Sequence, residues 1–290
     1  MNFDYCSRVP FQNKHVDELK KAYDIVFSKK EWHDALCLAS KALLDGKNVK
    51  ENCEQLMEAC GVHAYTLFDL VLIEALPALE HSYKMLGLDS ALFDGVIVDI
   101  RAKTVECENV YQIVGNNCYD WYIGFYDCTR LCLGRLQFEK RELRFDYKDY
   151  KKGDVVINTH IPSIGPLKYE DVMNSFKMAY KYFGDTVKDG VLPIVCSSWL
   201  LHDKTSLCFK KGGGLEMFYN MFDVIYNEDH DTNRNFWRIF DCEYKDFDKV
   251  PADTSLRRNI LNMIKSGQNM GAGYGVILFD GEKIKENKNA

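Results

Sequence analysis

The spacing of apolar residues changes near residue 118, and this change constrains the fold more than any other feature of the sequence. Before it, apolar residues recur at intervals of three and four, which is the spacing of one face of an α-helix. After it, short apolar runs are separated by turn residues, which is typical of strands. The sequence therefore predicts a helical domain over residues 1–118 and a mixed α/β domain over residues 119–290.

The first of these domains should contain several consecutive helices. Gly46 and Gly61 are predicted to end two of them, because glycine readily adopts the left-handed conformation found just past a helix end. Pro77 lies within another, which reads as helical on both sides of it. The helices are expected over residues 15–30, 31–46, 48–61, 65–85 and 96–114.

The second domain should begin with a hairpin, whose strands would cover residues 121–126 and 131–139. A strand over 155–160, a helix over 172–183 and a buried strand over 192–201 follow in order. A strand, helix and strand in this order form a right-handed crossover and make the two strands parallel. We therefore expect a mixed, mostly antiparallel sheet with one parallel pair and flanking helices. Further strands are expected at 236–240 and 274–279, and a further helix at 253–264.

Composition excludes several classes of protein. The formal net charge of −6 argues against a general nucleic-acid-binding surface and against a polybasic membrane surface. The 11 cysteines are odd in number and mostly lie in apolar runs, which indicates reduced core residues of a cytosolic protein. The chain shows neither a signal sequence nor an uninterrupted apolar run of ~20 residues. We expect a cytoplasmic protein without a nucleic-acid or membrane partner, whose oligomeric state stays open.

Two segments resemble metal sites but lack essential ligands. The segment that begins at Asp229 has the alternating oxygen ligands of a calcium loop, but Arg234 stands in place of the required glycine and Phe240 in place of the closing glutamate. Cys128 and Cys132 have no second pair at metal-ligand spacing. No metal site is therefore expected.

Residues 268–273 match the Q-x-x-G-x-G pattern with which many acetyltransferases hold the pyrophosphate of acetyl-CoA. Such a loop follows a strand and opens a helix, so that free amides and the helix dipole face the phosphates. Here the predicted helix precedes the motif and a strand follows it. We therefore interpret these glycines as a helix stop and a tight turn.

The loop after the strand at 155–160 has the context that a diphosphate requires. It lies between a strand and a helix, and Gly165 permits close approach of the backbone. Pro162 and Pro166 lack amide donors, and a purely structural turn is the alternative. The candidate binding residues are Ile161, Ser163, Ile164, Gly165, Leu167 and Lys168.

Candidate catalytic residues lie at the ends of the neighbouring strands. His160 could act as a general base near neutral pH, although a hydrogen-bonded structural histidine is the alternative. Glu139 is the only carboxylate expected to share a crevice with it. Ser198 or Cys196 could be a nucleophile, but neither is flanked by the glycines of a hydrolase elbow.

Four segments taken together resemble one family. They are residues 134–139 (GRLQFE), 160–162 with 165–167 (HIP and GPL), 196–201 (CSSWLL) and 251–258 (PADTSLRR). In this order they are similar to bacterial two-domain acyltransferase-domain proteins, in which a helical N-acyltransferase N-terminal domain precedes a GNAT-like C-terminal domain. The first half of the chain fits this family in length and helicity.

The resemblance implies that the parallel pair is splayed, with an acyl-CoA between its strands and the thioester carbonyl near the second strand. It implies an acyl-CoA-dependent N-acyltransferase, most simply an acetyltransferase, with acetyl-CoA or another acyl-CoA as donor and an amine of a small molecule or peptide as acceptor. The enzyme would position the substrates, deprotonate the amine and polarise the thioester. A catalytically silent GNAT-fold module that binds a ligand or partner is the main alternative, and a Ser/Cys hydrolase is a weaker one. The sequence leaves the acceptor, the acyl chain length and the general acid open.

Overall fold

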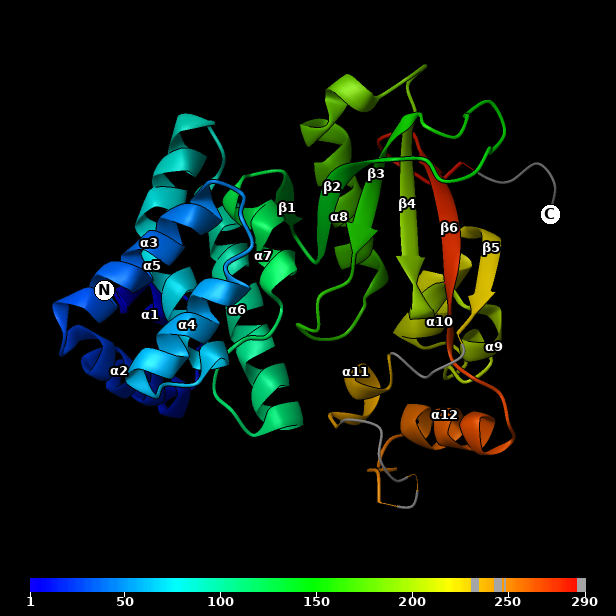
Figure 1. The fold of residues 1–290 in the computed structure, drawn as a ribbon. Helices are drawn as coiled ribbons and strands as arrows, with labels where there is room; N and C mark the ends of the chain where they lie inside the picture. Colours follow the sequence, from blue (N-terminus) through cyan, green and yellow to red (C-terminus); the bar gives the residue numbers. More distant parts are fainter. Residues whose placement is uncertain (231–234, 243–246, 248, 286–290) are drawn as a thin grey trace. The chain divides into compact units, whose positions relative to one another are not determined.

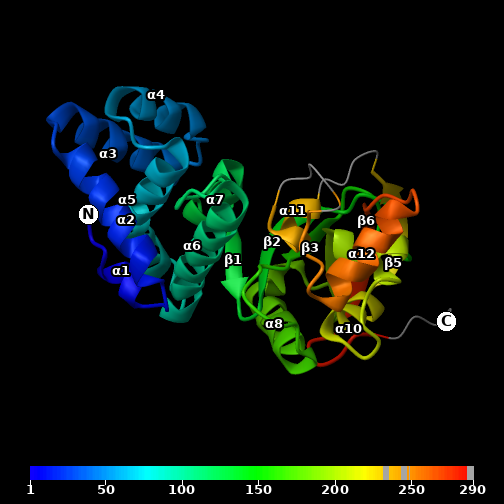
Figure 2. The same cartoon turned by 90° about the horizontal axis from the view of Figure 1, so that it is seen from below.

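The structure is a computed structural model, and it describes residues 1–230, 235–242, 247 and 249–285. The chain divides into two compact units, Met1–Cys132 and Leu133–Ala290 (Figures 1 and 2). The first unit consists almost entirely of helices and the second contains a mixed sheet with helices beside it. The predicted fold class is therefore confirmed.

Helices make up the first unit because apolar side chains at helical spacing are buried on each of them. Leu19 and Val26 of α2 and Leu36 and Leu43 of α3 are fully buried, and Gly61 ends α4 with the left-handed φ of 76° that was predicted. The five predicted helices are confirmed as α2 to α6. The helices of this unit are α1 (Asp4–Ser7), α2 (Asn13–Phe27), α3 (Lys30–Leu44), α4 (Lys50–Cys60), α5 (Ala64–Met85), α6 (Ser90–Tyr111) and α7 (Tyr119–Tyr126).

Helix α7 corrects the prediction of a strand over residues 121–126. The aromatic run favours a strand by intrinsic propensity, but sheet propensity mainly reflects packing context. Here Tyr119, Tyr122 and Tyr126 recur at helical spacing and are all buried. Tyr119 and Tyr122 pack against Phe68 of α5, and the Tyr126 hydroxyl donates to the Leu72 carbonyl. Contacts with a distant helix thus decide the conformation of this segment.

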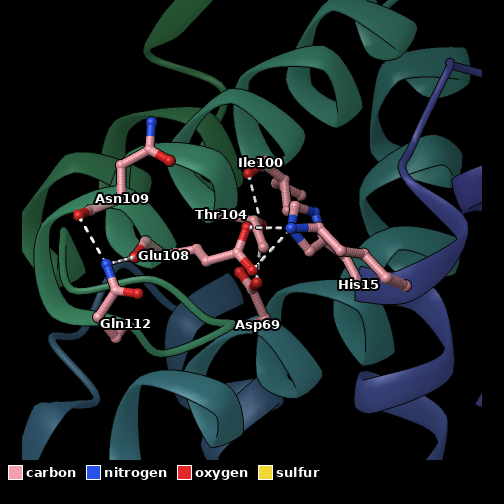
Figure 3. Close-up of polar contacts among 8 residues, drawn as sticks. His15, Asp69, Ile100, Thr104, Glu108, Asn109 and Gln112 are labelled. Atoms are coloured by element: carbon pink, nitrogen blue, oxygen red, sulfur yellow. Dashed lines mark hydrogen bonds and ion pairs between the residues drawn. The ribbon is translucent and has the colours of Figure 1, made fainter. Parts of the chain in front are cut away.

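A polar network inside the first unit was not indicated by any motif (Figure 3). The Thr104 hydroxyl on α6 lies 2.8 Å from Asp69 Oδ2 on α5 and 2.9 Å from the Ile100 carbonyl oxygen. A hydroxyl has one hydrogen, so it can donate to only one of these acceptors at a time. Asp69 is fully buried, and this burial raises the pKa of its carboxyl to about 7, against the opposing effect of Thr104. If Asp69 is protonated on Oδ2, it can donate to Thr104 while Thr104 donates to Ile100, so each of the two hydroxyl hydrogens has an acceptor.

One turn further along α6, Glu108 joins this helix to α2 (Figure 3). Lys14 Nζ donates to its carboxylate at 2.8 Å, and His15 Nε2 lies 2.8 Å from Oε2. The hydrogen bonds from Lys14 and then His15 lower the pKa of Glu108. His15 is fully buried, so its side chain contributes to the packing of α2 as well as to this contact.

We expect Asp69 to make the first unit less stable as pH rises. Its folded pKa of about 7 lies above the ordinary value, so the folded state binds more protons between about pH 4 and pH 7. The stabilisation that this protonation gives is complete below about pH 4 and is lost as pH rises through 7. Asp69→Asn keeps a donor without the charge, and should raise the thermal midpoint at pH 8 by about 2–4 °C for each kcal/mol recovered. Thermal unfolding at pH 5 and pH 8, with the exposed Asp17→Asn as control, measures this; an unchanged pH dependence in Asp69→Asn would contradict it.

The second unit is built on strands β2 to β6, which lie in the sheet order β2-β3-β4-β6-β5. Strands β3 and β4 pair in parallel, whereas β2 with β3, β4 with β6 and β5 with β6 pair antiparallel. The predicted parallel pair, connected through a helix, is therefore confirmed. The strands are β1 (Arg130–Leu133), β2 (Leu136–Glu142), β3 (Val155–His160), β4 (Leu192–Ser198), β5 (Asp223–Asp229) and β6 (Gly271–Phe279).

Helix α8 connects β3 to β4 and packs on one face of the sheet (Figure 1). The ring of Phe176 on α8 lies 6.3 Å from that of Phe138 on β2 and 5.9 Å from that of Phe279 on β6. All three side chains are fully buried, so this aromatic cluster fixes the helix over the sheet. The helical segments of this unit are α8 (Tyr169–Tyr182), η1 (Gly184–Thr186), η2 (Trp199–Leu201), α9 (Asp203–Ser206), α10 (Gly214–Asn220), α11 (Phe236–Phe240) and α12 (Ser255–Lys265).

Two other local predictions are corrected in this unit. Residues 236–240 form α11 rather than a strand, because Phe236, Ile239 and Phe240 are buried at helical spacing and share a core cluster with α12. Gly271 and Gly273 belong to β6 rather than to a turn. A Cβ atom at Gly273 would lie 1.8 Å from the Leu201 carbonyl oxygen, so the glycine is needed for the close approach of η2.

The structure also bears on cysteines, metals and membrane spans. All eleven cysteines are free, and six of them are buried. Within the described ranges, no cluster of three or more His, Cys, Asp or Glu side chains could hold a metal ion, and residues 231–234 of the calcium-like segment lie outside those ranges. Over the same part of the chain, no single helix is both long and apolar enough to cross a membrane. Helices α4 and α5 would pass together by length and composition, but they are bent by 116°.

Candidate active site

The parallel strands separate beyond their middle. The ladder between β3 and β4 joins only Ile157 to Ile194 and Asn158 to Val195. Strand β3 then continues beside β2, and β4 continues to Ser198 beside β6. The sheet is therefore splayed at the carboxyl ends of its parallel pair, which is where ligands bind in sheets of this kind.

Two of the predicted catalytic residues meet beside this opening. The register of β2 and β3 pairs Glu139 with Asn158 and Gln137 with His160, so these side chains share one face. His160 Nε2 lies 2.8 Å from Glu139 Oε1 and 2.9 Å from Asn158 Nδ2. A carboxylate oxygen only accepts, so an ionised Glu139 receives its hydrogen bond from Nε2. Arg141 Nε lies 3.0 Å from the same carboxylate oxygen.

Burial assigns different roles to the two partners. The Glu139 side chain is 5% exposed and lies between the guanidinium of Arg141 and the imidazole, whereas the His160 side chain is 23% exposed. The His160 ring is therefore partly accessible, and Glu139 holds it through the contact with Nε2. A purely structural histidine, the alternative interpretation, would make the same contacts.

Ser198 is not brought to this pair. Its hydroxyl accepts a hydrogen bond from the Leu200 amide at 3.2 Å and so begins η2. Strand alternation places Ser198 on the same side of β4 as Cys196, whereas Val195 shares a face with Asn158. Cys196 is fully buried, and this burial raises the pKa of its thiol. Among the described residues, no hydrogen bond joins Ser198 to His160 or Glu139, so this pair is not positioned as a base for Ser198.

The candidate diphosphate loop lies between β3 and α8 and presents backbone amides. The amides of Ser163, Gly165 and Leu167 have no hydrogen-bond partner in the part of the chain that the structure describes. The Ile164 amide differs, because it donates to the Pro162 carbonyl at 2.9 Å. Unpartnered amides next to a helix start can bind an anion.

The backbone around α8 shows how the other loop residues contribute. Lys168 precedes the helix without a side-chain cap, so the first-turn amides of α8 also lack an intrahelical or side-chain partner. Gly165 has a φ of +124°, a conformation that side-chain-bearing residues rarely adopt, and a Cβ there would meet no atom within 4 Å. Ile161 is half-buried and the Leu167 side chain is buried. The loop is exposed at Ser163, Gly165 and Lys168.

Sequence reasoning missed Asn158 and Arg141, which contact the predicted pair. A signal was present, because each lies two residues from a predicted site residue on the same strand. Residues two apart on a strand point to the same face. Applying this alternation to His160 and Glu139 would have identified both neighbours.

Comparison with known proteins identifies the family of the second half of the chain. Residues 131–277 match the family described as GNAT-like C-terminal domain, and they make up just over half of the chain. The protein therefore belongs to this family. No sequence match was found among curated proteins.

Several solved acyltransferase structures share the fold. An acyltransferase mutant, orf11*, in complex with octanoyl-CoA superposes with a TM-score of 0.72 at 15% identity, over 94% of this chain and 86% of that one. An acyltransferase in complex with decanoyl-CoA and teicoplanin gives a TM-score of 0.64 at 18% identity, over 74% and 67% of the two chains. Another, in complex with CoA and 10C-teicoplanin, gives 0.65 at 16% identity, over 82% and 75%. At these identities the similarity shows a common fold.

Proposed function

We propose that this protein is an acyl-CoA-dependent N-acyltransferase. The observation that carries the proposal is the position of the His160–Glu139 pair beside a splayed β3–β4 opening, with a loop of unpartnered amides directly after β3. A thioester in the opening would bring its carbonyl near β4 and its diphosphate near the loop. Membership of the GNAT-like C-terminal domain family supports this arrangement.

In the proposed reaction, His160 accepts a proton from the acceptor amine, and Glu139 stabilises the resulting imidazolium. The amine nitrogen then attacks the thioester carbonyl, the C–N bond forms and the C–S bond breaks. Free CoA leaves as the thiolate and takes up a proton. Amides at the splayed edge of β4 are suited to polarise the carbonyl oxygen as negative charge develops on it.

The loop residues would hold the cofactor portion of the donor. We assign the CoA diphosphate to the amides of Ser163, Gly165 and Leu167, with the Lys168 ammonium adding positive charge. Ile161 and Ile164 would line the loop with apolar surface. The neighbouring structures hold octanoyl-CoA and decanoyl-CoA, so we propose that the donor is an acyl-CoA whose chain can be longer than acetyl. An amine on a small molecule or peptide is the proposed acceptor, and the cytoplasm the proposed location.

Isothermal titration with CoA, acetyl-CoA, octanoyl-CoA and decanoyl-CoA tests the donor. We expect heat with at least one acyl-CoA, and release of free thiol when a panel of amines and short peptides is added. Binding without turnover would favour the silent GNAT-fold module, which the missing Q-x-x-G-x-G pattern in this loop supports. An acyl-protein trapped by intact mass spectrometry would favour the hydrolase chemistry of Ser198 or Cys196. Absence of heat with every CoA compound would overturn the proposal.

A further inference from the structure

Arg135 holds the backbone of the candidate diphosphate loop through three hydrogen bonds. Its guanidinium donates from Nη1 to the Pro162 carbonyl at 2.9 Å, from Nη2 to the Gly165 carbonyl at 2.6 Å and from Nε to the Pro166 carbonyl at 3.1 Å. Few side chains can make three donations in one plane, and this fork is particular to arginine. Arg135 therefore joins both ends of a five-residue turn.

The backbone of Arg135 is itself attached to α8. Its amide donates to the Ser175 hydroxyl at 2.8 Å, and that hydroxyl donates to the Asp171 carbonyl. Gly134, with a φ of 71°, forms the tight connection between β1 and β2 at this point, and a Cβ on it would lie 3.0 Å from Ser175 Oγ. The guanidinium is thus anchored on the helix that follows the loop it holds.

The three hydrogen bonds set the direction of the loop amides. Within one planar trans peptide, the carbonyl and the next residue's amide point in opposite directions. The Pro162 and Pro166 carbonyls face Arg135, so the amides of Ser163 and Leu167 face away from it. These are two of the amides without a partner in the described chain. The Gly165 carbonyl shares its peptide bond with the nitrogen of Pro166, which carries no hydrogen. The hydrogen bond from Arg135 to this carbonyl therefore fixes the peptide without affecting any amide donor.

The positive charge of Arg135 also favours an anion at the loop. Within the described part of the chain, no carboxylate lies within ion-pair distance of Arg135, and Asp171 acts on it only at longer range. Burial lowers the pKa of Arg135, which remains fully charged at neutral pH because an arginine starts from so high a value. A positive charge behind a layer of outward-facing amides strengthens their attraction for an anion.

We infer that Arg135 is a positioning residue, which fixes loop 161–168 so that its amides form the receptor for the diphosphate of acyl-CoA. This inference rests on the proposed function. It also explains how the loop could bind a diphosphate without the Q-x-x-G-x-G pattern. The Arg135 side chain, from the β1–β2 connection, would hold the loop backbone in the conformation that the glycines of that pattern allow in many acetyltransferases.

The test compares Arg135→Gln and Arg135→Lys with the wild type by titration of CoA and of 3′-dephospho-CoA. We expect both variants to lose tenfold or more in affinity, by the same factor for the two ligands, since both ligands contain the diphosphate. Lysine keeps the charge but cannot span three carbonyls. With octanoyl-CoA, or the best donor found, the KM should rise tenfold or more, while kcat at saturation stays within about threefold.

Arg258→Gln is the matched control, because Arg258 also donates to two backbone carbonyls, those of Ala252 and Asp253. It should bind CoA like the wild type. Wild-type affinity in either Arg135 variant would overturn the inference, as would an equal loss in Arg258→Gln. A loss confined to CoA, and absent with 3′-dephospho-CoA, would assign Arg135 to the 3′-phosphate and overturn it too. If the wild type binds no CoA, the proposed function fails and the inference fails with it.

Discussion

Replacing His160 with alanine should lower kcat/KM for amine acylation by about 10²–10⁴-fold, which is the usual contribution of a general base. The expectation follows from its position at the end of β3, its partial exposure beside the opening and its 2.8 Å contact with Glu139. A base must be unprotonated to act, so wild-type kcat/KM should rise with pH through one ionisation. In His160→Ala this rise should disappear or move, because the group that titrates is gone.

The Glu139→Gln variant tests whether Glu139 only orients the His160 ring or also stabilises its positive charge during proton transfer. The amide keeps the size of the side chain but removes the charge that stabilises the imidazolium, so the rate should fall less than in His160→Ala and the pH profile should shift to lower pH. Glu142→Gln, on the same strand but exposed, is the matched control and should leave both the rate and the profile unchanged. Losses below tenfold in both His160→Ala and Glu139→Gln would remove this pair from the mechanism and favour the structural histidine.

Gly165→Val should weaken the binding of CoA by about 5–150-fold, equivalent to about 1–3 kcal/mol. No atom lies within 4 Å of the Cβ position, so we expect the effect to arise mainly from the backbone. A φ of +124° is strained for a β-branched residue, and relief of that strain would rotate the peptides whose carbonyls Arg135 holds. The amides that face the diphosphate would then lose their common direction.

Gly153→Val is the matched control for Gly165→Val. Gly153 also has a positive φ, of +95°, with no atom within 4 Å of its Cβ position, but it lies in the connection between β2 and β3. Gly153→Val should therefore cause comparable backbone strain without affecting CoA. Titration of both variants, after circular dichroism has shown that they are folded, decides the matter. Equal affinity in Gly165→Val and the wild type would move the diphosphate site away from this loop.

Local sequence patterns were sufficient to predict the helices of the first unit and the β3–α8–β4 crossover. Amphipathic spacing and helix-stop glycines act within a few residues, and the chain order strand, helix, strand fixes the parallel pairing. His160 and Glu139 could be found because the pattern placed both on predicted strands and we expected them to share a crevice. His160 ends β3 as predicted, whereas β2 continues past Glu139 to Glu142.

Other features depended on contacts between residues far apart in the chain. Aromatic runs such as those of α7 and α11 fit either a strand or a helix, and burial against Phe68 or against α12 selected the helix. The Q-x-x-G-x-G glycines could be recognised from the sequence. Their structural role, which is to let η2 approach β6 closely, could not be predicted from it.

The sequence by itself determined the types and order of most elements, because those depend on spacing within a helix turn or a strand. Only the tertiary structure decided which polar groups meet. Burial raises the pKa of Asp69 against the opposing hydrogen bond from Thr104 of α6, and Arg135 reaches the Pro162, Gly165 and Pro166 carbonyls because α8 holds its backbone nearby. The physical reason is that burial and hydrogen-bond direction depend on groups tens of residues apart, which no local periodicity records.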